Sequence, residues 1–146
     1  MKTILPIEIV TLGDDNSYHL FVSGFIDDRQ CELLIDTGAS HTIFDSALIP
    51  EISAAETPIQ ELQSAGISEG ELNCKFGRIK NFKIGDLRRE NWTVVIIDLS
   101  HVNNIYKRFT DKRVTGLIGS DFLLKHGAII DYKKKELVLR NIRKIS

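Results

Sequence analysis

The sequence predicts a mainly β fold with one or two short helices. Short apolar runs rich in β-branched residues recur along the 146 residues, and turn-forming Gly, Asp and Asn residues separate them. Residues 99–109 have the apolar spacing of a helix, and residues 120–125 are followed by the stop signal of one. The length suits one core, so we expect residues 1–146 to form a single domain.

Strand-like segments fill the N-terminal part of the chain. Residues 3–12 are rich in Ile and Val, and Pro6 indicates an edge strand because proline cannot donate a ladder hydrogen bond. A hairpin is predicted from Tyr18–Ile26 to residues 31–35, with its turn at residues 27–30. This hairpin delivers Asp36 at its far end.

The central part has weaker signals. Residues 41–44 are expected to be extended, and residues 45–49 to form a short helical turn that Pro50 limits. From 59 to 76 the pattern indicates two weak strands around a tip with two glycines, residues 64–70. That tip is consistent with a mobile hairpin and equally with an ordinary surface hairpin.

The C-terminal half again favours strands. A hairpin is predicted from residues 78–84 and 92–98, and its turn at 85–90 is followed by the helix at 99–109. The remaining predicted elements are a strand into Leu117-Ile118, a short helix over Ser120–Lys125 with Gly127 near its C-terminal cap, and two strands, 128–132 and 136–139, joined by a lysine turn.

Asp36 is the residue that most needs an explanation. It ends the apolar run Leu33-Leu34-Ile35 and stands immediately before a Thr-Gly turn. Folded proteins seldom place a charge at the end of a buried strand, because its desolvation is costly. A chemical role for this carboxylate is therefore expected.

Two motifs in the same order resemble retropepsin-like aspartic proteases. The first is Asp36-Thr37-Gly38-Ala39-Ser40 after an apolar strand, which looks like the active-site loop of that family. The second is Gly116-Leu117-Ile118-Gly119 with the short helix that follows. The resemblance covers about residues 18–140 and implies a closed β-barrel, the acid protease fold, with the active site at a homodimer interface.

The implied chemistry is hydrolysis of peptide bonds in a peptide or protein substrate. Two carboxylates about 3 Å apart share one proton, so one activates water while the other protonates the substrate. This chain has a single Asp-Thr-Gly, so Asp36 can form the pair only with Asp36 of a second copy. The resemblance suggests residues 2–10 and 136–142 as interface strands.

Supporting roles follow from the same resemblance. Thr37 would bond across to the loop of the second copy, Gly38 would let substrate approach, and Ser40 would position a carboxylate oxygen of Asp36; Ala39 completes the loop. Thr37 and Ser40 could equally do no more than satisfy turn backbone groups. Packing under the loop is assigned to Leu117, Ile118 and Gly119, and the flap over the substrate to Ala65, Gly66 and Ile67.

Other functions find little support. A net charge of −1 gives no basic field for nucleic acid, and no run approaches the about 20 apolar residues that cross a bilayer. Cys31 and Cys74 lack metal or redox spacing, and the four histidines are scattered, so we expect no metal and no cofactor. Without a signal-like N-terminus, a cytoplasmic location is expected.

Two alternatives to an aspartic endopeptidase stay open. The chain could keep the fold as a noncatalytic peptide-binding or dimerisation module, because fold does not fix activity. It could also be an unrelated small β-barrel in which Asp-Thr-Gly is only a turn; a strictly monomeric protein with Asp36 facing solvent would favour that interpretation.

Overall fold

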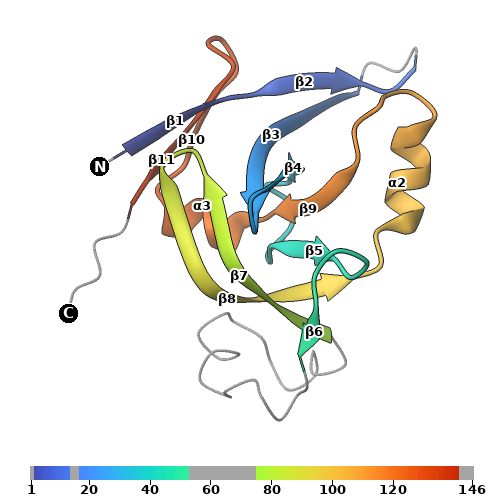
Figure 1. Cartoon of the computed structure of the whole chain (residues 1–146). Coiled ribbons are helices and arrows are strands. Elements are labelled where there is room, and N and C mark those ends of the chain that lie inside the picture. The colour runs from blue at the N-terminus through green and yellow to red at the C-terminus, as the bar shows by residue number, and fades with distance from the viewer. Residues whose placement is uncertain (1, 14–16, 53–74, 142–146) are drawn as a thin grey trace.

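The computed structural model describes residues 2–13, 17–52 and 75–141, which form a mainly β structure with two short helices (Figure 1). The elements in chain order are β1 (Lys2–Pro6), β2 (Glu8–Thr11), β3 (Tyr18–Ile26), β4 (Arg29–Ile35), β5 (Ile43–Asp45), β6 (Glu51–Ile52), β7 (Lys75–Ile84), β8 (Leu87–Ile97), α2 (Ser100–Lys107), β9 (Val114–Ile118), α3 (Ser120–Lys125), β10 (Ile129–Asp131) and β11 (Glu136–Arg140). The predicted fold class is confirmed. Within the described ranges, no helix is long and apolar enough to cross a membrane.

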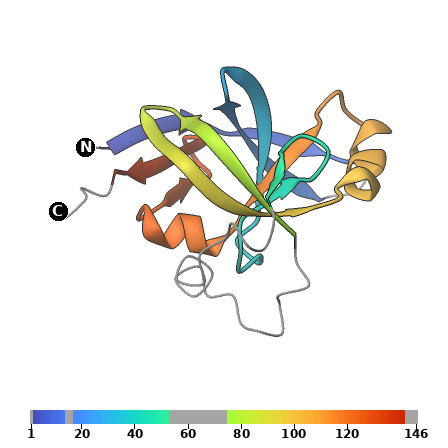
Figure 2. The same cartoon turned by 60° about the horizontal axis from the view of Figure 1, so that its bottom comes forward.

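Six strands close into a barrel, as predicted. Their hydrogen-bonded order is β3-β4-β9-β5-β8-β7, and a β3–β7 pairing at Phe25 and Ile26 completes the ring. The β4–β9 and β5–β8 pairs are parallel, whereas the other pairs of the ring are antiparallel. Figure 2 shows the barrel with α2 and α3 on opposite sides of it.

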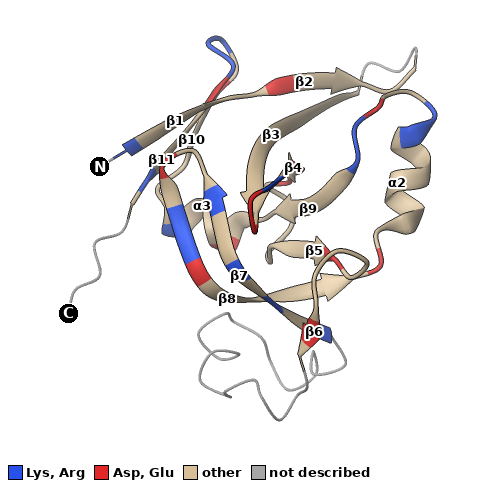
Figure 3. Cartoon of the chain, viewed as in Figure 1, with Lys and Arg blue, Asp and Glu red and all other residues tan. Residues whose placement is uncertain are grey.

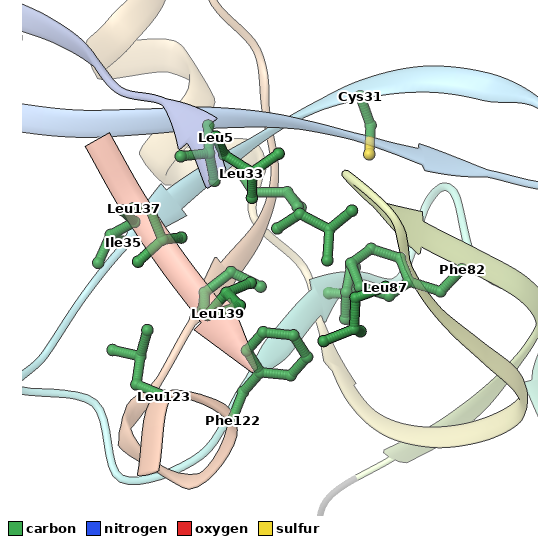
Figure 4. Packing of buried hydrophobic residues seen from close by; sticks show 14 of the residues in the cluster. Leu5, Cys31, Leu33, Ile35, Phe82, Leu87, Phe122, Leu123, Leu137 and Leu139 are labelled. Carbon is green, nitrogen blue, oxygen red and sulfur yellow. The ribbon is translucent and has the colours of Figure 1, made fainter. Parts of the chain in front are cut away.

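The barrel interior is filled by alternate side chains of its strands. Leu33 and Phe44 are fully buried, and Phe82 and Phe122 are nearly so. Aromatic rings contact edge to face in this core, with Phe44 and Phe82 centroids 5.9 Å apart. Figure 4 shows Leu33 and Phe82 packing toward side chains from α3 and from the terminal strands. Period-two burial along the strands explains why the sequence pattern predicted them.

A second sheet brings the two ends of the chain together. Its order is β1-β11-β10, and β1 pairs antiparallel with β11 from Lys2↔Arg140 to Pro6↔Glu136. Leu137 and Leu139 of β11 point into the core and are fully buried. Residues 2–6 and 136–140 of the segments suggested above as interface strands therefore pair with each other within one chain, whereas residues 8–10 pair with β3.

Two local expectations need correction. The turn between β7 and β8 is only Gly85-Asp86, because the polar residues Arg88 to Glu90 lie on the strand β8 and do not form the predicted loop. Gly85 has φ +60, and a Cβ there would lie 2.3 Å from Thr3 Oγ1, so the turn requires glycine. Residues 45–49 form no helix: a turn with a Leu48 N–H to Asp45 O hydrogen bond follows β5.

Candidate active site

Asp36 lies at the end of β4, where the chain leaves the barrel core. Leu33 and Ile35 point into the core and are 0% and 8% exposed. Asp36 follows them at the edge of the core and is half-buried. The Asp36 N–H still donates to Ile118 O of the parallel strand β9, at 2.9 Å. The β4–β9 pairing thus fixes the start of the loop against the end of β9.

The loop is a tight turn closed by its own carboxylate. Gly38 N–H donates to Asp36 Oδ1 at 3.1 Å, and Ala39 N–H donates to Asp36 O at 3.1 Å. An aspartate side chain that accepts a hydrogen bond from the backbone amide two residues later forms an Asx-turn. Thr37, Gly38 and Ser40 are exposed and Ala39 is half-buried, so the loop presents its tip outward. Among the described residues, the bond to Asp36 Oδ1 comes from Gly38 and not from Ser40.

The first residues of α3 anchor this loop. Ser120 N–H donates to Ala39 O at 2.8 Å, and Ser120 Oγ donates to Thr37 O at 2.7 Å. A Cβ at Gly119 would lie 2.7 Å from the carbonyl carbon and oxygen of His41, closer than real Cβ contacts come. Glycine at position 119 therefore permits the loop and the helix to touch through their backbones.

Leu117 and Ile118 support the loop from β9. Ile118 is fully buried in the barrel core, and Leu117 is half-buried on the opposite face. Leu117 packs with Leu34 in a second, smaller apolar cluster whose buried members are Phe21, Leu99, Tyr106 and Val114. The structure thus brings both members of the Leu117-Ile118 pair next to the strand that ends at Asp36.

Thr42 belongs to the site, although the sequence reasoning gave it no role. Its side chain is only 4% exposed, its Oγ1 accepts from Gly119 N–H at 3.0 Å, and it donates to Asp121 Oδ1 at 2.7 Å. One hydroxyl therefore satisfies a buried amide and orients the first turn of α3. No local pattern marks Thr42, because its role depends on contacts with residues 77 and 79 positions away in the sequence.

Tyr106 and His19 form a polar pair on the side of the sheet that α2 covers. Tyr106 Oη lies 2.9 Å from His19 Nδ1, and the Tyr106 side chain is 5% exposed. Burial, and after it the negative charge of Asp36, raises the pKa of the Tyr106 hydroxyl. Asp36 is thus within electrostatic reach of a hydroxyl that α2 contributes. Sequence reasoning treated His19 as isolated and did not predict this neighbour.

The residues assigned to the flap, Ala65, Gly66 and Ile67, lie outside the described residues. Cys74 lies outside them as well. Cys31 is buried on β4 as a free thiol. The described site therefore consists of the Asp36 loop, the end of β9, the start of α3 and the Tyr106–His19 pair.

Comparisons with known proteins identify a family and two similar structures. The model of a family described as aspartyl protease matches residues 22–122, which is more than half of the chain. Two solved structures are similar: a retropepsin-like aspartic protease from Rickettsia conorii (19% identity, TM-score 0.45, covering 95% of this chain and 92% of that one) and the retroviral protease-like domain of Ddi1 from Leishmania major (18% identity, TM-score 0.45, covering 82% of each). No curated protein matches.

A closed barrel whose strand end presents an Asp-Thr-Gly loop, anchored by a short helix, defines the class of retropepsin-like folds. The chain belongs to the aspartyl protease family. The resemblance that the two sequence motifs suggested is confirmed.

Proposed function

We propose that this protein is an aspartic endopeptidase whose catalytic pair consists of Asp36 from each of two identical subunits. The observation that carries the proposal is the placement of half-buried Asp36 at the end of β4, where its carboxylate accepts from Gly38 N–H and its backbone N–H donates to the Ile118 carbonyl. A single Asp-Thr-Gly occurs in the sequence, so one chain supplies half of the required pair.

The chemistry follows from placing the two carboxylates together. Two carboxyl groups about 3 Å apart do not both ionise, because their negative charges would repel each other. The pair therefore retains one proton. The ionised member takes a proton from a water molecule as it attacks the peptide carbonyl, and the protonated member donates to the carbonyl oxygen. The resulting tetrahedral intermediate collapses when the leaving amine is protonated. No metal or cofactor takes part in these steps.

The surroundings of Asp36 support this role through rigidity. Ser120 donates two hydrogen bonds to carbonyl groups of the loop. Thr42 Oγ1 accepts from the N–H of Gly119, the residue directly before Ser120 at the start of α3. A catalytic group must be held within a fraction of an ångström of its productive position, and backbone anchoring to a helix achieves this better than a free loop. The substrate is an extended peptide, which pairs its main chain with the enzyme as an added strand does.

Asp36→Asn is the decisive variant, and Asp98→Asn is its matched control. Both residues follow a barrel strand directly, but Asp98 is exposed at the end of β8 and bonds to Ser100 N–H. We expect Asp36→Asn to abolish cleavage of an unfolded protein and of a peptide library, and Asp98→Asn to retain it. Circular dichroism checks that both variants fold.

Two outcomes contradict the proposal. Cleavage that survives in purified Asp36→Asn removes Asp36 from the chemistry. If the native protein binds a statine-containing transition-state mimic but cleaves nothing in the library, the chain is a noncatalytic peptide-binding module instead.

A further inference from the structure

A buried histidine joins the end of helix α3 to the end of strand β11. His126 is the residue directly after α3 and is 5% exposed. Its Nδ1 lies 3.0 Å from Arg140 O, and its own carbonyl accepts from Arg140 N–H at 2.8 Å. His126 N–H donates to Phe122 O in the helix at 3.1 Å. The side chain and the backbone of one residue therefore hold the last residue of β11 to α3.

The hydrogen bond to Arg140 decides which nitrogen of the His126 ring carries the proton. A carbonyl oxygen can only accept, so Nδ1 must be the donor. In the neutral ring, Nε2 then has a lone pair and no proton. Nε2 is buried and has no hydrogen-bond partner among the residues that the structure describes. Protonation of Nε2 would create a buried N–H without an acceptor, which is unfavourable.

A row of aromatic rings leads from His126 to a cation on β8. The His126 ring packs on Phe122 with centroids 4.5 Å apart, and Phe122 packs on Trp92 at 5.8 Å. The half-buried Arg89 guanidinium lies 4.4 Å from the centre of the Trp92 ring. The next residue on β8, Glu90, is exposed and alternates to the other face of the strand. The charge that β8 presents on the His126 side is therefore positive.

The charges of β8 and α3 disfavour a second positive charge on the ring. Burial lowers the pKa of His126, the bond to the Arg140 carbonyl opposes this, and the charges of Arg89 and Lys125 lower the pKa further. Burial also lowers the pKa values of Arg89 and Lys125, whereas the negative charge of Asp121 on α3 opposes that lowering. Asp121 thus favours the charged forms of the two cations that repel a charged His126.

The charged groups of β1, β10 and β11 add to this balance. Lys2 on β1 is the register partner of Arg140. Asp131 of β10 and Glu136 are partners of each other, at the other end of β11 from Arg140. Figure 3 shows basic segments of β1, β8 and β11 on the side of the molecule from which both termini emerge. A proton on His126 would therefore add a positive charge to a part of the molecule that is already basic.

We propose that His126 is an acid-sensitive clasp, which holds the end of β11 to α3 while its ring is neutral and releases that end when the ring is protonated. The inference goes beyond the proposed function and does not depend on it. The protonated ring has a donor without an acceptor in the buried site, so it leaves the site and breaks the bond to Arg140 O. The result is a local opening at the joined ends of β11 and β1 in acid.

The opening occurs in the element that also carries the candidate catalytic loop. Ser120 at the start of the six-residue helix α3 anchors the Asp36 loop, and His126 follows the last residue of the same helix. The clasp therefore sets an acid limit below which the terminal sheet is loose at its contact with this helix.

The direction of the pH dependence follows from which state binds the proton. In the open state the imidazole ionises near its ordinary pKa of about 6.5, and burial in the closed state lowers the pKa of His126. The open state therefore binds more protons in the window below about pH 6.5. The closed state has its full stability above that window and loses stability as the pH falls through it. At about pH 5 an ordinary imidazole favours its charged form about thirtyfold, which is the upper bound of the effect.

Hydrogen exchange at Arg140 measures the clasp directly, because Arg140 N–H donates to His126 O. Exchange rates at about pH 7.5 and about pH 5 are divided by the rates of an unstructured peptide at the same pH, which gives the opening constant at each pH. We expect this constant to rise about tenfold toward the lower pH in the native chain. Ser46 N–H, which donates to Ile97 O at the end of β8, is the internal control and should change by less than about twofold.

His126→Asn and His101→Asn form a matched pair of variants. The side-chain amide in His126→Asn can donate to Arg140 O as Nδ1 does, and it does not titrate. His101 lies exposed on α2. We expect His126→Asn to abolish the acid rise at Arg140 and His101→Asn to retain it. NMR titration of the imidazole signals in the native chain needs no variant to fold, and the His126 ring should have its midpoint below about pH 6.5.

Three outcomes overturn the proposal. The first is an acid rise at Arg140 that is equal in the native chain and in His126→Asn, which assigns the pH dependence to other groups. The second is an opening constant at Arg140 that is the same at both pH values. The third is a His126 ring that titrates at or above about pH 6.5. If His126→Asn does not fold, the exchange and the titration of the native chain decide. None of these measurements uses peptide cleavage, so the proposed function stands or fails separately.

Discussion

The Thr42 hydroxyl donates a 2.7 Å hydrogen bond to Asp121 Oδ1 and accepts one from Gly119 N–H, so it joins the chain beyond the Asp36 loop to the first turn of α3. Asp121 Oδ1 also accepts from Phe122 N–H at 2.8 Å. These bonds connect two segments 79 residues apart in the sequence. The anchoring of the candidate catalytic loop thus involves a side chain that is itself buried.

Thr42→Val removes both hydrogen bonds with little change of shape. The buried Gly119 N–H is then left without an acceptor, which costs about 1–3 kcal/mol of unfolding free energy. Urea unfolding followed by circular dichroism measures the loss. Thr42→Ser keeps the hydroxyl and should recover most of it. Equal stability of the Val and Ser variants would show that the hydroxyl bonds contribute nothing.

Gly119→Ala tests the contact between loop and helix. The new Cβ would meet the His41 carbonyl at 2.7 Å and Ala39 O at 2.9 Å, both backbone atoms, so the loop must move. We expect a loss of about 1–3 kcal/mol in unfolding free energy, together with reduced peptide cleavage. Gly38→Ala is the control for stability, since its Cβ meets only Asp36 Oδ1 at 3.4 Å. A Gly119→Ala variant as stable as Gly38→Ala contradicts this packing.

The ionisation of Tyr106 reports on the charge of Asp36. Burial raises the pKa of Tyr106, and the Asp36 carboxylate raises it further because phenolate and carboxylate repel. Asp36→Asn removes that repulsion, so the pKa of Tyr106 should fall. Absorbance of tyrosinate during alkaline titration measures the change. Tyr18 and Tyr132 are 64% and 66% exposed, and replacing them by Phe isolates the Tyr106 signal. An unchanged titration would place Asp36 out of reach of Tyr106.

Cys31 should behave as an inert thiol in the folded protein. Burial raises its pKa from 9.0 to about 12, so little reactive thiolate exists at neutral pH. In a Cys74→Ser background, iodoacetamide should modify Cys31 only after unfolding, as measured by mass spectrometry. Rapid labelling of the native chain would contradict the buried position.

The same shift makes stability depend on alkaline pH. The unfolded thiol ionises near pH 9.0 and the folded thiol near about 12, so the folded state binds the extra proton between these values. The contribution of Cys31 to stability is therefore complete below about pH 9 and is lost as the pH rises toward about 12. Compared with Cys31→Ala, the native chain should lose more unfolding free energy over that window. Parallel curves for the two proteins would contradict the linkage.

The local residue pattern was sufficient to predict an element where that element contains its own periodicity or stop signal. Tyr18–Ile26 and Ser120–Lys125 have the bounds that alternation and the glycine stop signal predict. The pattern failed at Arg88 to Glu90, because polar residues on a strand with one solvent-facing side look like a loop. The pattern also failed at residues 45–49. Their composition predicted a short helical turn, but in the structure they form a non-helical turn after β5. In both places the neighbouring strand, and not local preference, decides the conformation.

The Asp36 loop and its Leu117-Ile118-Gly119 neighbour could be identified from the sequence because each is a contiguous motif. Thr42, Asp121 and the Tyr106–His19 pair could not, since each depends on contacts between residues 79 or 87 positions apart. Sequence patterns report periodicity and turn chemistry, and they contain no information on which distant side chains meet.

Local residue order by itself determined the mainly β class, the aspartate that follows an apolar strand, and the fact that the chain holds a single Asp-Thr-Gly. Tertiary structure decided that β1 pairs with one side of β11 inside the chain and that β10 pairs with the other side. The physical reason is that strand pairing satisfies backbone groups which every residue carries alike. The partner of a strand is therefore set by the packing of the whole core and not by the residues of that strand.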